Sequence, residues 1–155
     1  MEVIWETKHF NELSLTELYN ILKLRSDVFV VEQRCIFLDI DDNDQNHYHC
    51  IGKIGEDIVA TTRLFRKGQH YEDYQCIGRV CTSSKYRGKG LGRKLMEFSI
   101  KECSRLFGNG EPIRIGAQAY LQEFYGSFGF CKCGDDYIED DIPHIPMLRQ
   151  PDRAL

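Results

Sequence analysis

Residues 76–107, CIGRVCTSSKYRGKGLGRKLMEFSIKECSRLF, contain the pattern that decides the fold. Residues 76–82 are mostly small or apolar and predict a strand covered on both faces. From Gly90 to Phe107, apolar residues recur at helical spacing, which predicts a long amphipathic helix that ends at Gly108. The segment between them is rich in glycine, lysine and arginine. A basic, glycine-rich turn is therefore expected directly before the first turn of a helix.

This turn predicts a binding site for an anion. The first N–H groups of a helix lack intrahelical acceptors, and the helix dipole adds positive charge there. Glycines let a phosphate approach the backbone closely, and arginines add charge-assisted hydrogen bonds. We predict that the turn binds the pyrophosphate of a cofactor. The residues expected to hold it, which we call the cradle, are Arg87, Gly88, Lys89, Gly90, Leu91, Gly92 and Arg93.

Two better-known glycine-loop motifs do not match these residues. Walker A requires a second glycine five positions after Gly88, and the dinucleotide motif GxGxxG requires its third glycine at the same place. That position is Arg93. A plain turn with solvated lysine and arginine side chains stays open as the structural alternative.

The remaining pattern predicts an α+β fold with helices on both faces of a mixed sheet. Ser14 and Glu17 match a capping box for a helix that begins near Leu15. Gly55 lies between two apolar runs and predicts a hairpin. Further strands are expected at 3–7, 49–54, 58–66, 113–118, 130–132 and 145–149, with a short helix at 121–128.

Length and composition favour one domain, residues 1–155, in the cytoplasm. The chain is 42% hydrophobic and 28% charged, as in ordinary globular proteins. No stretch is long and apolar enough to span a membrane, and the N-terminal residues do not resemble a secretion signal. The formal net charge of −4 argues against a nucleic-acid partner, whose phosphates require a basic face.

No metal site is expected. Cys50, Cys76 and Cys81 lie in strand-like runs and are predicted to be core residues. Cys131 and Cys133 lack the spaced ligand set of a zinc site. The acidic loop at 39–50 begins like a calcium-binding EF-hand, but it has aspartate and cysteine where that motif needs its glycine and glutamate.

The cradle resembles the motif [QR]xxGx[GA] of the GNAT acetyltransferase superfamily, with Arg87, Gly90 and Gly92 at its defined positions. Within that superfamily the chain is similar to the ElaA-like N-acetyltransferase group, through LRSDVFVVEQ, IGRV, GAQAYLQEFYGSFGF and IPHI. The resemblance implies a GNAT fold with a splayed central strand pair and acetyl-CoA as the co-substrate. Ser84 stands where many relatives carry proline, and Gln118 where many carry asparagine.

The resemblance also implies roles for individual residues. Tyr125 is implied as the general acid, although a tyrosine beside Phe124 and Phe128 on one helix face is also a plain core residue. His49 and His144 are candidates for the base, with a water relay as an open alternative. The residues implied to contact the pantetheine arm are Val80, Cys81, Thr82 and Gln118.

The acceptor is expected to be a primary amine of a small molecule or a peptide. Two acidic runs, 39–44 and 135–141, are predicted to flank it and to attract cationic amines. The predicted edge strands 3–7 and 145–149 would allow a homodimer. A module of the same fold that binds acyl-CoA without catalysis is the alternative function.

Overall fold

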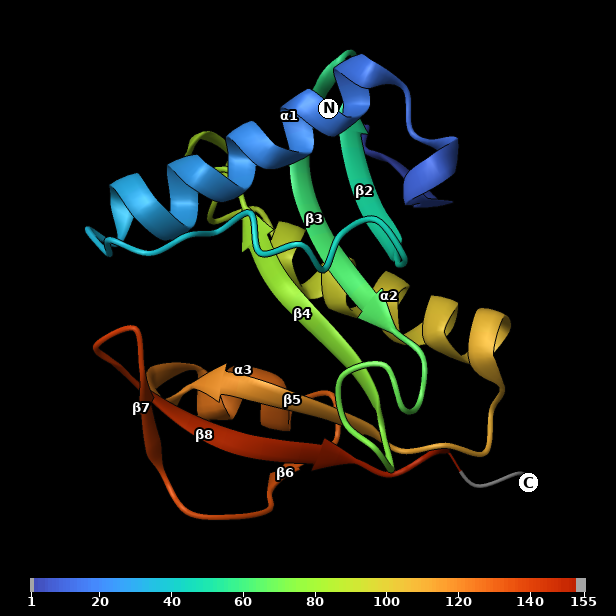
Figure 1. Ribbon diagram of the computed structural model, residues 1–155, viewed down its shortest axis with the longest axis vertical. Coiled ribbons are helices and arrows are strands. Elements are labelled where there is room, and N and C mark those ends of the chain that lie inside the picture. Colours follow the sequence, from blue (N-terminus) through green and yellow to red (C-terminus); the bar gives the residue numbers. More distant parts are fainter. Residues whose placement is uncertain (1, 153–155) are drawn as a thin grey trace. The chain divides into compact units, whose positions relative to one another are not determined.

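The computed structural model describes residues 2–152, which form two compact units. Among the described residues, the first unit contains 2–64 and 79–99, and the second contains 65–78 and 100–152. The strand β4 (Gln75–Thr82) and the helix α2 (Leu91–Phe107) each contribute residues to both units, as does the last residue of β3 (Asp57–Phe65). Figure 1 shows the helices and strands along the chain.

The first unit is built on an antiparallel sheet. It contains β1 (Ile4–His9), β2 (Tyr48–Ile54) and β3 (Asp57–Phe65), and β3 is followed in the sheet by β4. The helix α1 (Leu15–Arg25) begins at the predicted capping box, where Ser14 accepts from the Glu17 N–H at 3.0 Å. It continues as a π-helix over Ser26–Glu32. Short 3-10 turns span Phe10–Glu12 and Ser84–Tyr86.

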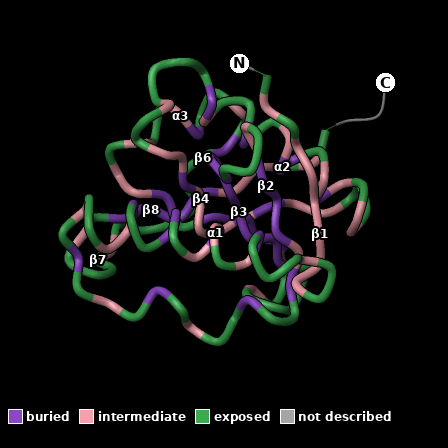
Figure 2. Tube along the Cα trace, turned by 90° about the horizontal axis from the view of Figure 1, so that it is seen from above, coloured by how far each residue is buried: buried purple, intermediate pink, exposed green. Residues whose placement is uncertain are grey.

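The helices α1 and α2 pack on opposite faces of this sheet. Ile21 and Leu24 of α1 pack with Ile51 of β2 in one apolar cluster. Leu91 and Leu95 of α2 pack with Val59 in another. Figure 1 shows α1 in front of β2 and β3, and α2 behind them. The strands between the helices are covered on both sides, which explains the long buried runs of β2 and β3 in Figure 2.

The second unit contains the smaller elements that follow α2. These are β5 (Ile113–Gln118), a 3-10 turn (Ala119–Leu121), α3 (Gln122–Gly126), β6 (Phe130–Lys132), β7 (Tyr137–Glu139) and β8 (Ile142–Arg149). β8 is antiparallel to β5, β6 and β7. The first half of β4 lies parallel to β5, and their register covers only Gln75 with Ile113 and Cys76 with Arg114.

The α+β architecture is confirmed, and the strand order is β1-β2-β3-β4-β5-β8-β6 with β7 on β8. The prediction that residues 145–149 form an edge strand was wrong, because β8 lies between β5 and β6. The proposed dimer contact through that strand therefore fails. β7 was not predicted, since three residues inside an acidic run carry too little strand pattern.

Candidate functional site

The predicted residues fall into two sets, one in each unit. The first set begins where β4 ends at Thr82. Gly88 and Gly90 have φ of +82° and +75°, a left-handed conformation that favours glycine, and α2 begins at the next residue. The Lys94 N–H donates to the Gly90 carbonyl at 3.1 Å. The N–H groups that precede it in the first turn of α2 are those that lack an intrahelical acceptor. The structure thus contains the predicted strand, glycine turn and helix start.

The cradle is open to solvent. Lys89, Arg93 and Lys94 are exposed, and a β-carbon built at Gly88 or Gly90 meets no atom within 4 Å. Arg93 pairs with Glu97 at 3.9 Å. Lys89 and Lys94 make no ion pair with any residue of 2–152, so the surface at the start of α2 keeps positive charge, as an anion site requires.

Arg87 is held at the edge of the cradle by two contacts. Its guanidinium donates to Glu32 at 2.7 Å and to the Thr82 carbonyl at 3.0 Å. Glu32 ends the π-helix that follows α1, so this pair ties the cradle to a second element of the same unit. The partner could not be predicted, since the two residues lie 55 positions apart.

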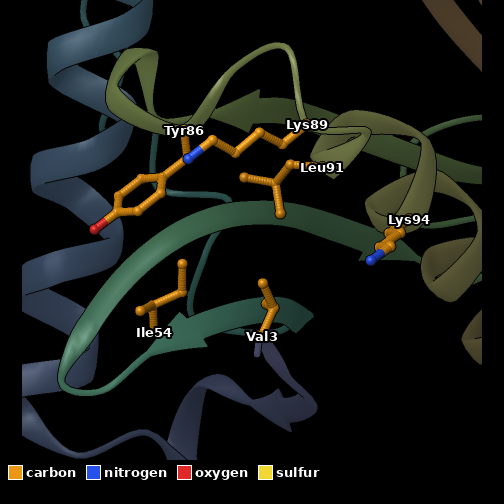
Figure 3. Close-up of a pocket in the computed structure, with 6 residues that line it drawn as sticks. All are labelled: Val3, Ile54, Tyr86, Lys89, Leu91 and Lys94. Carbon is orange, nitrogen blue, oxygen red and sulfur yellow. The ribbon is translucent and has the colours of Figure 1, made fainter. Parts of the chain in front are cut away.

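A small pocket adjoins the cradle (Figure 3). Its lining combines apolar side chains with two lysines: Val3, Ile54, Tyr86, Lys89, Leu91 and Lys94. At about 80 Å³ it is smaller than the roughly 300 Å³ at which pockets for whole ligands begin. It can accommodate one part of a larger ligand that lies along the cradle.

The residues of β4 before the cradle leave extended geometry at one position. Arg79 has φ of +48°, which is uncommon for a residue other than glycine. Val80 packs toward α2, whereas Cys81 belongs to the cluster under α1. Burial raises the pKa of the Cys81 thiol to about 12, so this cysteine stays protonated and is a poor nucleophile.

The first acidic run does not form an open acidic surface. Asp39 and Asp44 are buried, and Arg25 pairs with both, at 3.0 and 2.7 Å. Arg63 pairs with Asp41 at 2.8 Å and with Asp44 at 2.9 Å. The expectation that this run attracts a cationic acceptor was therefore wrong, because arginines inside the unit neutralise the carboxylates of Asp39, Asp41 and Asp44 and leave only Asp42 unpaired among the aspartates of the run.

Arg79 completes this network, which we call the arginine–aspartate network. Its Nε lies 2.9 Å from Asp39, and its Nη2 lies 3.2 Å from Asp41. Its guanidinium also lies over the rings of Phe29 and Phe37. Three arginines thus face three aspartates, and the network has no net charge.

Burial raises the pKa of Asp44, but hydrogen bonds and charge from Arg25 and Arg63 outweigh it and hold this pKa below the usual range. His49 is 1% exposed, and its Nε2–H donates to the Asp44 carbonyl at 3.0 Å. Burial lowers the pKa of His49, so the ring is neutral at pH 7. The structure therefore places this base candidate inside the network.

The second set of predicted residues lies in the second unit. Gln118 ends β5 and is the cross-strand partner of His144 on β8. The Nδ1–H of His144 donates to the Ile142 carbonyl at 2.7 Å, because a carbonyl oxygen can only accept. The neutral ring consequently keeps the lone pair on Nε2, which lies 3.8 Å from the exposed Glu139 carboxylate.

Tyr125 lies on α3 and is 6% exposed. Its ring packs edge-on against Phe124 and Phe130. Burial raises the pKa of its hydroxyl, so the proton is retained at neutral pH. The side chain therefore contributes to packing and also holds a proton.

The chain has relatives of known family. The acetyltransferase (GNAT) domain family matches residues 30–150. Protein ElaA of Escherichia coli is 40% identical over 148 residues, covering 94% of this chain and 95% of ElaA. The UPF0039 protein sll0451 of Synechocystis is 40% identical over 149 residues, covering 96% of both chains.

Solved structures agree with these sequence relatives. An acyl-CoA N-acyltransferase from Pseudomonas aeruginosa superposes with a TM-score of 0.90 at 41% identity, covering 96% of this chain and 99% of that one. The crystal structure of Escherichia coli ElaA superposes with a TM-score of 0.87 at 40% identity, covering 95% of this chain and 99% of that one. The chain belongs to the GNAT acetyltransferase family, and its relatives include ElaA. It is an acyltransferase of that type, as the sequence predicted.

Residues 2–152 contain no group of three His, Cys, Asp or Glu side chains arranged to hold a metal ion. No helix among them is long and apolar enough to cross a membrane.

Proposed function

We propose that this chain is a cytoplasmic N-acetyltransferase that moves an acetyl group from acetyl-CoA to a primary amine of a small molecule or a peptide. The observation that carries the proposal is the open, cationic cradle at the start of α2, with left-handed glycines at 88 and 90. Family membership supports the class of reaction.

The residues of the first unit suit the phosphate end of acetyl-CoA. The pyrophosphate would lie on the N–H groups of the cradle, with Arg87 and Arg93 as charged donors. Val80, Cys81 and Thr82 would bind the pantetheine arm through their backbone, and Gln118 would add a side-chain contact. When bound, acetyl-CoA supplies an activated thioester.

Glu32 positions the guanidinium of Arg87 for a phosphate. The carboxylate holds the guanidinium beside the cradle, and a phosphate would share or replace this contact. Because water reaches both side chains, replacing the Glu32 contact by a phosphate contact costs little free energy.

We assign the acid role to Tyr125 and the base role to His144. The Tyr125 hydroxyl keeps its proton at neutral pH and can donate it to a thiolate, whose conjugate acid has a pKa near 8.5. Nε2 of His144 can accept a proton, since Nδ1 is occupied by the Ile142 carbonyl. We do not extend the base role to His49, whose ring is enclosed in the arginine–aspartate network.

Replacing Tyr125 with phenylalanine tests the acid role, because it removes the hydroxyl and keeps the ring. We expect kcat to fall by about 10² to 10⁴, with a smaller change in acetyl-CoA affinity. Tyr120→Phe is the matched control, since Tyr120 is exposed. If single-turnover measurements show the same chemical step in wild type and Tyr125→Phe, the tyrosine is a packing residue only.

The proposal as a whole is tested by release of free CoA thiol from acetyl-CoA across a panel of amines. We expect at least one amine to raise thiol release well above hydrolysis in buffer, with an equal amount of acetylated amine by mass spectrometry. If acetyl-CoA binds but no amine does so, the chain is an acyl-CoA-binding module and the proposed reaction is wrong.

A further inference from the structure

Arg114 is an unneutralised cation on the sheet of the second unit. Its side chain makes no ion pair and no hydrogen bond to any described residue, and its Nε is inaccessible to solvent. The guanidinium instead lies over two rings, 4.8 Å from the centre of Tyr71 and 6.0 Å from that of Tyr74. Removing a guanidinium partly from water without a carboxylate partner costs free energy of folding. Arg114 lacks the aspartate partners that Arg25 and Arg63 have.

Successive side chains of β5 point to opposite faces of the sheet, and this alternation determines which residues surround Arg114. Ile113, Ile115 and Ala117 point to the buried side, so Arg114, Gly116 and Gln118 share the other face. On the neighbouring strands, His144 is the cross-strand partner of Gln118, and Tyr137 is the partner of His144. Directly paired residues project from the same face of a sheet. Four side chains of one face, those of Arg114, Gln118, His144 and Tyr137, therefore surround Gly116.

Two phenol hydroxyls lie over Gly116. A β-carbon at this position would collide with the Tyr137 hydroxyl and would lie 3.9 Å from that of Tyr71. Neither hydroxyl has a hydrogen-bond partner among residues 2–152. Desolvation by burial raises the pKa of both phenols, so both keep their protons at neutral pH. Arg114 and these hydroxyls thus form a set of donors without acceptors.

The opposite end of this face has the complementary chemistry. The Tyr137 ring stacks on His144 at 5.5 Å, and His144 Nε2 faces Glu139. Arg114 and Gln118 are four residues apart, or about 13 Å along an extended strand. The face therefore has a cation at one end, two hydroxyl donors over Gly116 between the ends, and an acceptor nitrogen with a carboxylate at the other end.

From this arrangement we infer that Arg114, Tyr71 and Tyr137 bind a carboxylate carried by the amine acceptor. A guanidinium binds a carboxylate through two parallel hydrogen bonds, and the phenols add further donors. Glu139 and His144 suit the amine end of the same molecule. The inference rests on the proposed function for the acceptor's amine. It names the acceptor class as amino carboxylates, in place of the cationic amines that the acidic runs suggested.

The binding test uses protein with ¹⁵N-labelled arginine, in which the Arg114 Nε–H signal is identified by its loss in Arg114→Gln. We expect β-alanine and 6-aminohexanoate to shift this signal saturably, while the corresponding amides leave it unchanged. An equal response to inorganic phosphate would show a general anion site and would overturn the carboxylate assignment. The absence of any shift would overturn the site.

The kinetic test compares each amino carboxylate with its amide as an acetyl acceptor. We expect kcat/KM to favour the carboxylate by about 10²-fold, mostly through KM, because a charged hydrogen-bonded pair is lost in the amide. Arg114→Gln should abolish this preference, and Tyr71→Phe or Tyr137→Phe should reduce it by roughly tenfold or less. Arg66→Gln, which removes another arginine that lies over an aromatic ring, should keep it.

These results separate the inference from the proposed function. If amines are acetylated without any preference for a carboxylate in the wild-type protein, the site is wrong and the reaction stands. If the Nε signal responds but no amine is acetylated, the site stands and the reaction is wrong.

Discussion

Two groups of arginines in the first unit show how the same residue type serves two purposes. Arg25 in the arginine–aspartate network is 1% exposed, and both of its partners are buried aspartates. Arg87 in the cradle is 42% exposed, and its carboxylate partner Glu32 is 36% exposed. The network is charge-balanced and closed, whereas the cradle keeps charge that a ligand can use. Pairing and burial, more than residue type, distinguish an arginine fixed in the fold from one that is available to a ligand.

The difference has a physical cause. Removing a charge from water costs several kcal/mol unless a partner compensates for it, so a buried arginine requires its aspartates and they require it. An exposed arginine is solvated in the free protein and loses little when a phosphate replaces its partner. The comparison predicts which variants lose stability and which lose function.

The largest effect is expected for Arg25→Ala. It leaves Asp39 and Asp44 buried with fewer partners, and we expect the free energy of unfolding to fall by about 3–5 kcal/mol. Arg87→Ala is the matched control and should lower it by about 1 kcal/mol or less. Urea unfolding of both variants measures the difference. Equal losses would mean that the network and the cradle do not differ as described.

Acid should weaken the paired carboxylates of the first unit. Burial raises the pKa of Glu17, but hydrogen bonds from Lys53, from the Ser14 N–H and from Lys8 outweigh it and set this pKa to about 2. The pKa of Glu17 is lower in the folded than in the unfolded protein, so the ionised carboxylate stabilises the fold. This contribution to stability is complete above about pH 4.5 and disappears as the pH falls toward 2.

We expect Glu17→Gln to lower the free energy of unfolding by about 1–2 kcal/mol at pH 7 and by much less at pH 2. The value is modest because water screens the partly exposed lysines that pair with Glu17. Unfolding free energies of both proteins between pH 7 and pH 2 measure this. A constant difference over the whole range would show that charge is not responsible.

The smallest effect is expected at Asp42, an exposed carboxylate of the first acidic run. Its φ of +63° is tolerated by asparagine, so Asp42→Asn should fold normally. Because the other aspartates of the run are paired, we expect the salt dependence of kcat/KM for a cationic amine to change by less than about twofold. A large change would restore the steering role that the structure argues against.

Local patterns in the sequence were sufficient for most elements. The bounds of β5 and β6 were predicted correctly, the capping box at Ser14 was present, and the strand, glycine turn and helix of the cradle occurred as expected. Each of these depends on residues within a few positions of one another. Spacing alone reveals such features.

The ion pairs could not be predicted in this way. Arg25 and Asp39 are 14 positions apart, and Arg63 and Asp41 are 22 apart. In the sequence, the aspartates look like a solvated or substrate-facing run, because burial is decided by the fold. The same is true of Arg114, whose environment comes from a loop and two further strands. The roles of residues with partners far away in the sequence could therefore not be predicted from local patterns.

The central claim is that the cradle binds acetyl-CoA, and isothermal calorimetry of Gly92→Val tests it most directly. Gly92 lies in the first turn of α2 and is not among the glycines with positive φ, so valine is compatible with its backbone. Gly110→Val is the matched control, since a β-carbon there meets no atom within 4 Å.

We expect wild type and Gly110→Val to bind acetyl-CoA with the same affinity, and Gly92→Val to bind at least about 10²-fold more weakly, because the branched side chain occupies the place of the pyrophosphate. All three proteins should have similar melting temperatures. Equal affinity in Gly92→Val and wild type would contradict the account.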